Sequence, residues 1–230
     1  MLAQSAHSLP KVSRPARDLL GHRSGMAVNS LDDAIQGMGV STLFQRNAEI
    51  FGESDPAVYL YKVVSGAVRT YKVLSDGRRQ VGGFYLAGEV FGLETGDTHT
   101  LSAEAVTETR VLVIKRSVLL TLAERDSEIA RQLWTLTGNE LRRLQDHVLT
   151  LVQTAKERVS GFLLEMATRA PSEDRVDLPM SRQDIADYLG LTIETVSRTL
   201  TQLENTEAIA LPNSRCFELR DRRALGHLGG

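Results

Sequence analysis

Four side chains between residues 193 and 198 have the types that read DNA bases. They are Ile193, Glu194, Ser197 and Arg198, and their spacing places them on one side of a helix. Arginine can donate two hydrogen bonds to guanine, glutamate can accept one from cytosine or adenine, and isoleucine can pack on a thymine methyl. Serine can reach a base or a phosphate. These residue types predict a surface that binds double-stranded DNA.

Two short helices joined by a tight turn are expected to carry these residues. Ser181 is a candidate helix cap with Asp184 three residues later, and Gly190 can end the first helix in a left-handed conformation. Thr192 can cap the second helix. The apolar positions recur at helical spacing and predict the buried faces: Ile185, Ala186, Leu189, Val196, Leu200 and Leu203. This pattern predicts a helix-turn-helix whose second helix enters a major groove. The alternative is a helical hairpin in an unrelated domain.

The runs DIADYLG and GLTIETVSRTL resemble the DNA-reading motif of the CRP/FNR regulators, on the FNR and FixK side of that family. The similarity extends more weakly from about Ile50 to Leu219. The resemblance implies a homodimer that binds a palindrome of the form TTGAT and ATCAA and that recruits RNA polymerase as an activator. Where cyclic-AMP receptors of the family have arginine, this chain has Ile193, so a different half-site is expected.

Other residues near this motif are expected to hold the DNA backbone or to have purely structural roles. Phosphate contacts are expected from Arg182, Thr192, Thr195 and Thr199, which would set register without reading sequence. The pair Glu194 and Arg198 can alternatively be a surface ion pair, because they lie four residues apart. Cys216 is expected to be a half-buried strand thiol, with redox sensitivity as the alternative.

Composition limits the class of protein. The chain has 230 residues, 42% hydrophobic and 24% charged, with a net charge of -2. Such a charge is not that of a general polyanion binder, so local basic residues must supply any DNA contact. One cysteine excludes an intrachain disulfide framework and indicates a reducing, cytoplasmic location. No apolar run is long enough to span a membrane, and no secretory signal is recognised.

The pattern along the chain predicts an α+β fold with four parts. Residues 1–30 are expected to form a flexible tail, with a transit peptide as the alternative reading. Residues 31–126 contain short strands separated by turns, including the hairpin signal Asp76-Gly77, and predict a β-roll. Residues 127–153 predict one long helix. Residues 154–230 predict a helix, a loop over 170–176, the helix-turn-helix, and a two-stranded wing over 208–211 and 216–219.

The long helix carries an apolar stripe that needs to be covered, although Glu140 interrupts it. Its own domain can cover the stripe, or a second copy can pack on it as a two-stranded coiled coil. The family resemblance favours the second arrangement and a dimer. The residues expected at the dimer interface are Ile129, Leu133, Leu136, Leu144, Val148 and Leu151.

The roll resembles a cyclic-nucleotide-binding sensor domain, but its expected ligand positions are changed. Cyclic-AMP receptors of the family place Glu just after a Gly-rich corner and an Arg-Ser pair further on, whereas this chain has Leu93 and Leu101-Ser102. A phosphate buried without a cation is costly. The single Cys216 cannot supply the four-cysteine ligand set of an iron–sulfur cluster. His99 is expected to be a solvated loop residue rather than a haem ligand.

These observations predict a protein that is not an enzyme and has no cofactor. The scattered histidines do not fit a cupin-like metal site, and no Ser-His-Asp spacing, P-loop or dinucleotide fingerprint occurs. We therefore expect a winged helix-turn-helix transcriptional activator in an oxygen-responsive cascade, with an N-terminal cyclic-nucleotide-binding-like β-roll and a long dimerisation helix. The alternative is a cyclic-nucleotide-binding signalling module.

Overall fold

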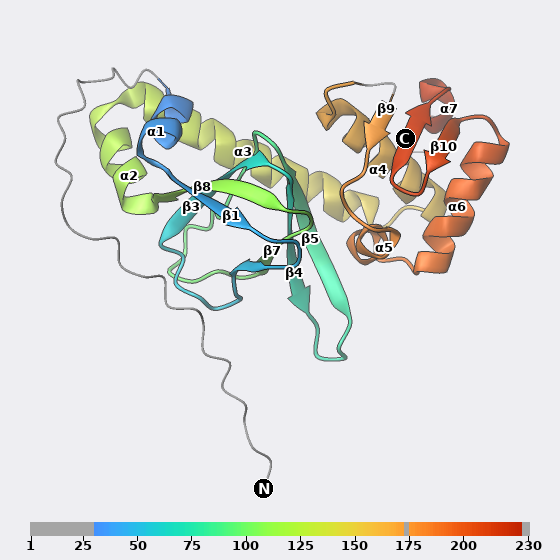
Figure 1. Cartoon of the computed structure of the whole chain (residues 1–230), viewed down its shortest axis with the longest axis horizontal. Helices are drawn as coiled ribbons and strands as arrows, with labels where there is room; N and C mark the ends of the chain where they lie inside the picture. Colours follow the sequence, from blue (N-terminus) through green and yellow to red (C-terminus); the bar gives the residue numbers. More distant parts are fainter. Residues whose placement is uncertain (1–29, 173–174, 227–230) are drawn as a thin grey trace, which may run out of the picture.

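A computed structural model describes residues 30–172 and 175–226. The tail predicted for residues 1–30 lies almost entirely outside the described residues. The described chain has an α+β fold with a β-roll, a long helix and a helical C-terminal domain that holds a small sheet (Figure 1).

The β-roll consists of two four-stranded antiparallel sheets. One has the order β1-β8-β3-β6 and the other has the order β2-β7-β4-β5. Burial alternates along β7, as expected for a strand with one buried side, whereas the first four residues of β4 are all buried. The strands are β1 (Val40–Phe44), β2 (Glu49–Phe51), β3 (Tyr59–Ser65), β4 (Ala67–Val73), β5 (Arg79–Leu86), β6 (Val90–Phe91), β7 (Ser102–Ala105) and β8 (Thr109–Lys115).

Aromatic residues fill the space between the two sheets. Tyr61 on β3 stacks on Phe91 with ring centroids 5.0 Å apart, and Tyr85 on β5 lies 5.2 Å from the same ring. The predicted hairpin joins β4 to β5, and Gly77 in its turn has a φ of 82°, which favours glycine. Both the hairpin and the roll are therefore confirmed, while the sequence did not indicate β1 and β2.

Three helices pack at one end of the roll. They are α1 (Leu31–Met38), α2 (Arg116–Arg125) and the beginning of α3 (Ser127–Thr150). Their apolar side chains form a cluster with Leu60, Leu112 and Ile114 of the sheet. Asp126 caps α3 by accepting hydrogen bonds from the next backbone amides. This cluster fixes the direction in which α3 leaves the roll.

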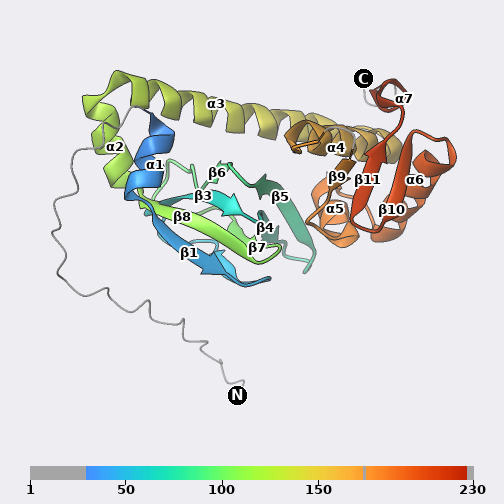
Figure 2. The same cartoon turned by 45° about the horizontal axis from the view of Figure 1, so that its top comes forward.

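Helix α3 runs along the molecule and connects the roll to the C-terminal domain (Figure 2). The chain turns after Thr150 and continues as α4 (Ala155–Arg169). Thr154 and Glu157 form a reciprocal capping box at the start of α4, as residues of these types three positions apart do in many helices. The boundary between the long helix and the C-terminal domain thus lies at a helix cap.

The C-terminal domain packs α4, α5 (Arg182–Leu189), α6 (Ile193–Asn205) and α7 (Arg222–Gly226) against a three-stranded sheet of order β10-β11-β9. The strands β10 (Ile209–Asn213) and β11 (Cys216–Leu219) form the predicted wing. The loop predicted over 170–176 was wrong at its end, because β9 (Arg175–Asp177) pairs with β11 and buries Val176. Pro171 marks only the beginning of that connection.

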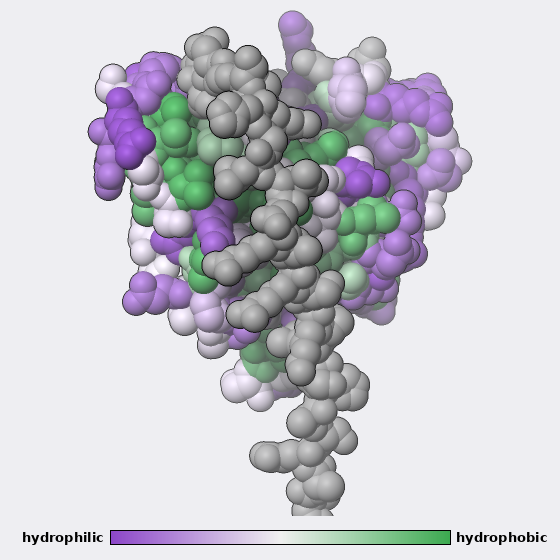
Figure 3. Space-filling model, turned by 60° about the vertical axis from the view of Figure 1, so that its left-hand side comes forward, coloured by the Kyte–Doolittle hydropathy of each residue, from purple (hydrophilic) through white to green (hydrophobic). Residues whose placement is uncertain are grey.

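The surface at the roll end is mixed where Figure 3 leaves it uncovered. Figure 3 brings that end forward and shows hydrophobic patches interrupted by hydrophilic residues wherever the surface is not grey. Exposed apolar residues there include Val40 and Leu43 of β1. None of the helices within the described ranges is long and apolar enough to cross a membrane.

Candidate nucleic-acid interface

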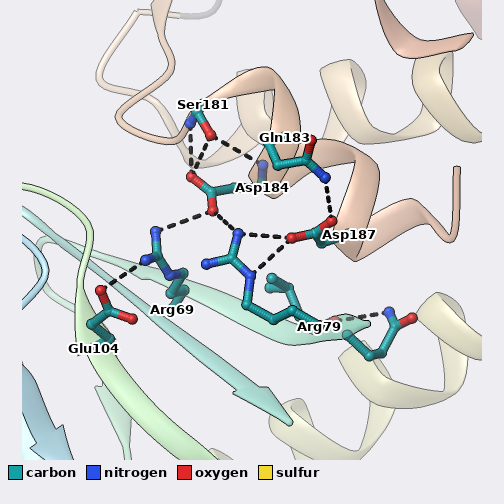
Figure 4. Close-up of polar contacts among 9 residues, drawn as sticks. Arg69, Arg79, Glu104, Ser181, Gln183, Asp184 and Asp187 are labelled. Atoms are coloured by element: carbon teal, nitrogen blue, oxygen red, sulfur yellow. Dashed lines mark hydrogen bonds and ion pairs between the residues drawn. The ribbon is translucent and has the colours of Figure 1, made fainter. Parts of the chain in front are cut away.

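The first helix of the helix-turn-helix begins at a capping box. The Ser181 hydroxyl accepts a hydrogen bond from the Asp184 amide at 3.1 Å, and Asp184 Oδ2 accepts one from the Ser181 amide at 3.0 Å (Figure 4). Burial raises the pKa of Asp184, but hydrogen bonds from Ser181 and the charges of Arg69 and Arg79 outweigh burial and leave that pKa below its usual value. Asp184 is therefore ionised at neutral pH.

The turn between the two helices depends on two residues. Gly190 has a φ of 63°, a left-handed conformation that suits glycine at a helix end. Thr192 caps α6 by accepting a hydrogen bond from the Thr195 amide at 3.2 Å. On the inner side of α6, Val196, Leu200 and Leu203 are buried as expected. The rotation of α6 about its own axis is thereby fixed.

The side of α6 that faces away from this core carries the four residues expected to read bases. Ile193, Glu194 and Arg198 are exposed and Ser197 is half-buried. In the part of the chain that the structure describes, no hydrogen bond or ion pair is formed by the Arg198 guanidinium, so its donors are free for a ligand. The Glu194 amide and the Thr192 hydroxyl, with a smaller effect from Arg198, hold the pKa of Glu194 below its usual range. The face thus presents one anionic and one cationic side chain.

The four residues expected to hold the DNA backbone do not all reach the surface. Thr192 is exposed and Thr195 is half-buried at the start of α6, and Arg182 is half-buried at the start of α5. Thr199 is only 5% exposed, because its position turns it toward the core beside Leu200. The prediction that Thr199 contacts a phosphate is therefore wrong, and the hydroxyl belongs to the packed side of α6.

Cys216 is a buried strand residue on β11 and not a half-buried one. Burial and the neighbouring Asp177 raise the pKa of its thiol. A raised pKa lowers the fraction of thiolate at neutral pH, and the thiolate is the reactive form. The structural role is therefore favoured over redox sensitivity.

The stripe predicted on α3 is divided between two environments. Ile129 is 1% exposed within its own roll, and Leu133 and Leu136 pack partly against the same cluster. The assignment of Ile129 to a dimer interface is therefore wrong, because its surface is already covered. Glu140 does not merely interrupt the stripe, since it accepts a hydrogen bond from Tyr85 of the roll at 2.8 Å.

The second half of α3 leaves apolar side chains uncovered. Leu144 and Val148 are exposed and Leu151 is half-buried. The sequence stripe missed further exposed residues because strict three- and four-residue steps omit the flanks of a wide apolar face. These are Trp134, Leu141, Leu149 and Val152, with Trp134 81% exposed. The apolar surface available to a partner is wider than the predicted stripe.

A cavity of about 360 Å³ lies between the roll and α3. Leu93 and Leu101 line it together with Thr70, Tyr85 and Glu140. Neither arginine nor lysine lines this cavity among the described residues, whereas two of the lining groups are carboxylates, Glu94 and Glu140. A cyclic phosphate placed here would meet two carboxylates, and the guanidinium of Arg143, which does not line the cavity, is already paired with Glu140 at 2.8 Å, so the site is unfavourable for a phosphate. The residues present do not fit a cyclic nucleotide.

His99 lies in the roll but not on its surface. It is 2% exposed and stacks on Phe51 with ring centroids 3.6 Å apart, so the expectation of a solvated loop histidine is wrong. Its Nδ1 lies 3.3 Å from a carboxylate oxygen of Glu94. Across the described ranges, no three His, Cys, Asp or Glu side chains come together in a way that could hold a metal ion.

Comparison with known proteins agrees with the motif and with the roll. A family model for the Crp-like helix-turn-helix domain matches residues 157–228, and one for the cyclic nucleotide-binding domain matches residues 42–126. The nitrogen fixation regulation protein FixK of Azorhizobium caulinodans is 48% identical over 97% of this chain and 92% of its own length. The chain belongs to the CRP/FNR family of DNA-binding transcriptional regulators.

Within that family the chain is similar to FixK proteins. FixK of Rhizobium meliloti is 41% identical over 84% of this chain and 89% of its own length. The solved structure of FixK2 from Bradyrhizobium japonicum has a TM-score of 0.81 and 49% identity, and covers 84% of this chain and 98% of that one. The resemblance inferred from the recognition motif is therefore confirmed, together with the fold class.

Proposed function

We propose that this protein binds a palindrome similar to TTGAT-N4-ATCAA as a homodimer and activates transcription from promoters that contain it. The observation that carries the proposal is the uncovered face of α6, where Glu194 and Arg198 are exposed and Ser197 is half-buried. Arg198 binds the guanine of each half-site, Glu194 accepts from an exposed base amine, and Ile193 packs on a thymine methyl.

Dimerisation on α3 supports the palindrome. The exposed apolar residues of its second half, including Leu144 and Val148, need a cover, and a second copy provides one by two-fold symmetry. Two symmetric recognition helices then lie about one DNA turn apart, roughly 34 Å, and bind inverted half-sites. Leu133 and Leu136 contribute only the part of their surface that the roll leaves open.

Phosphate contacts next to α6 set the register of the helix in the groove. The exposed Thr192 hydroxyl and the neighbouring Thr195 lie at the amino end of α6, and Arg182 begins α5. Their positions favour contacts with the DNA backbone on either side of the major groove. Such contacts strengthen binding to all sequences and leave discrimination to the outward side chains.

The activity does not require a cyclic nucleotide or an iron–sulfur cluster. The cavity lined by Leu93 and Leu101 lacks a cation for the phosphate, and one cysteine cannot hold a cluster. FixK-like regulators and the fumarate and nitrate reduction regulatory protein of Vibrio cholerae, 34% identical over 73% of this chain, support a place in an oxygen-responsive cascade in the cytoplasm. Contact with RNA polymerase through exposed loops would provide the activation step.

Selection of bound duplexes from random DNA tests this function. The purified full-length chain is mixed with a random library without added nucleotide, and the enriched sequences are read. We expect inverted repeats of TTGAT separated by four base pairs. Enrichment of direct repeats, of unrelated sequences, or of nothing above the starting library would contradict the proposal.

A further inference from the structure

The hairpin of β4 and β5 extends from the roll and contacts the first helix of the helix-turn-helix (Figure 1). Four charged residues meet there, which we call the interdomain clamp: Arg69 and Arg79 of the hairpin, and Asp184 and Asp187 of α5 (Figure 4). The two sides of the clamp lie more than 100 residues apart in sequence. The clamp therefore joins two domains and not neighbouring turns of one domain.

The contacts of the clamp are short and specific. Arg79 Nη2 lies 2.6 Å from Asp184 Oδ1, and Arg79 Nε donates to Asp187 Oδ2 at 2.8 Å. Arg69 donates to Asp184 Oδ1 at 3.1 Å and to Glu104 of β7 at 2.8 Å. Two arginines thus converge on one oxygen of Asp184, which is only 4% exposed. Charge-assisted hydrogen bonds of this kind restrict direction as well as distance.

Asp184 connects the clamp to the motif itself. Its Oδ1 accepts from the two arginines, while its Oδ2 accepts from the amide and hydroxyl of Ser181 at the start of α5. One carboxylate therefore caps the helix and also attaches it to the roll. Because α5 and α6 are joined by the tight turn at Gly190, the position of α5 determines the position of α6.

Apolar packing alone would hold the domains together without fixing their angle. Phe84 of β5 lies 5.3 Å from the Tyr188 ring and 6.3 Å from the Phe162 ring, measured between centroids. Burial of this kind is nondirectional. Buried ion pairs add little net stability, but they can favour one arrangement over others. Phe84 therefore supplies nondirectional burial, whereas the clamp supplies directional contacts at α5, in addition to the pair that Arg169 of α4 forms with Glu89 of the roll at 2.7 Å.

With the clamp closed, the base-reading face of α6 stays open. Arg198 and Glu194 are exposed, and the hairpin lies beside the amino end of α6, where its residues border an open groove lined by Thr192, Ile193 and Glu194. We propose that the interdomain clamp holds the helix-turn-helix at the angle required for a dimer to bind two half-sites at once. Arg79, Arg69 and Asp187 are thus positioning residues for DNA binding. This inference rests on the palindromic dimer proposed above.

Half-site spacing provides the sharpest test. Affinity is measured for the palindrome that the wild-type chain selects, and for the same site with one base pair inserted between its halves. The insertion rotates one half-site by about 35° relative to the other. A fixed dimer binds the longer site much more weakly, whereas a dimer with loosened domains can follow the rotation.

We expect Arg79→Gln to weaken binding to the selected palindrome by about five- to tenfold, the range of a modest coupling between two sites. It should also lower the spacing ratio, which is the affinity for the selected palindrome divided by the affinity for the site with one inserted base pair. Arg131→Gln is the control, since it removes the same charge from an arginine that pairs with a carboxylate, Glu128, at the end of α3 remote from the helix-turn-helix. Arg131→Gln should keep the wild-type spacing ratio.

Two further measurements separate positioning from other roles. In a double-mutant cycle, Asp187→Asn should add little to Arg79→Gln, because both changes remove the same contact. The slope of log affinity against log salt concentration should be the same for Arg79→Gln as for the wild-type chain. Loss of a phosphate contact would instead reduce that slope by about one per protomer. Urea unfolding of each variant shows that the compared proteins are folded.

The clamp would be overturned, and the proposed function left intact, by either of two results. One is an unchanged spacing ratio in folded Arg79→Gln, and the other is a salt slope reduced as for a lost phosphate contact. A wild-type protein that selects no palindrome, or shows no preference for spacing, would overturn the proposed function and the clamp with it. A lowered spacing ratio confined to Arg79→Gln and Asp187→Asn would support the clamp.

Discussion

The outer face of α6 and the cavity between the roll and α3 both lie open to a ligand, but they offer opposite chemistry. Helix α6 presents the exposed guanidinium of Arg198 beside Glu194, on the side opposite the buried Val196 and Leu200. The cavity presents leucines and carboxylates where a phosphate would need a cation. The face that we propose to meet DNA offers hydrogen-bond donors to the bases, whereas the cavity offers no cation to a phosphate. A protein with this fold can therefore have a DNA-binding helix without a cyclic-nucleotide site in its roll.

The largest effect is expected from removing the cation on α6. Arg198→Ala loses a bidentate contact with guanine worth about 1–3 kcal/mol in each half-site. The loss occurs twice in a symmetric dimer, so specific binding should be nearly abolished. Affinity is measured for the palindrome and for a site with its G·C pairs exchanged, at two salt concentrations.

Arg131→Ala is a suitable control for that experiment, because Arg131 is an exposed arginine paired with Glu128 at the far end of α3. It should leave both affinities unchanged. A phosphate contact would instead weaken binding to both sites equally and lower the salt slope by about one per contact. If Arg198→Ala preserves the ratio between the two sites, Arg198 does not read guanine.

The next effect concerns assembly, on which binding to both half-sites depends. Replacing Leu144 and Val148 by Asp places two charges on the uncovered half of α3 in each protomer, where a dimer would bury them. Sedimentation should show monomers, and affinity for the palindrome should fall at least about tenfold as the second half-site contact is lost.

Leu120→Asp is the matched control for assembly, since Leu120 is an exposed leucine on α2, outside the proposed interface. It should sediment like the wild-type chain. Should the Leu144 and Val148 variant also sediment as an unchanged dimer, the interface lies on another surface.

Local signals in the sequence identified most of the elements. Ser181, Gly190 and Thr192 end or begin helices through contacts within a few residues, so their types and spacing were sufficient. Asp76-Gly77 marked the hairpin for the same reason. The inward and outward sides of α6 followed from helical periodicity, and the error at Thr199 arose because a threonine is equally suited to a buried and an exposed position.

Contacts between distant segments were not predictable in this way. Arg69 and Asp184 are separated by 115 residues, and either alone resembles an ordinary surface charge in sequence. The burial of Ile129 and His99 also depends on which segments the fold brings together. Short β9 escaped notice because three residues carry too little alternation to distinguish a strand from a loop. These features need the tertiary structure.

A smaller effect is expected at the contact between α3 and the helix-turn-helix. His147 stacks on Tyr188 with ring centroids 4.0 Å apart, and burial together with the charge of Arg143 lowers the pKa of His147 below 6.5. A histidine with a lowered pKa in the folded state favours folding when neutral. Its contribution is present above about pH 6.5 and is lost as pH falls through the lowered pKa.

Urea unfolding at pH 8 and pH 5.5 measures this contribution at one fixed protein concentration. His147→Phe can keep the stack on Tyr188 but cannot bind a proton. We expect the unfolding midpoint of the wild-type chain to fall more between the two pH values than that of His147→Phe. Equal decreases would show that protonation of His147 does not affect this contact.

The smallest effect is expected from adding cyclic AMP. In the cavity beside α3, Leu101 and Leu93 supply no charge, and Glu94 and Glu140 would repel a phosphate. Binding there would bury an anion without a partner, which costs several kcal/mol. Affinity of the full-length chain for its palindrome should therefore change by less than about twofold at millimolar cyclic AMP, well below the 5–150-fold range of typical allosteric coupling.

Addition of 5′-AMP at the same concentration controls for ionic effects on DNA binding. A rise of tenfold or more with cyclic AMP alone would mean that the cavity rearranges to bring in a cation, and Arg143 is a candidate because it pairs with the lining residue Glu140 at 2.8 Å. That result would remove the contrast between the outer face of α6 and the cavity, because the roll would then bind a regulatory ligand.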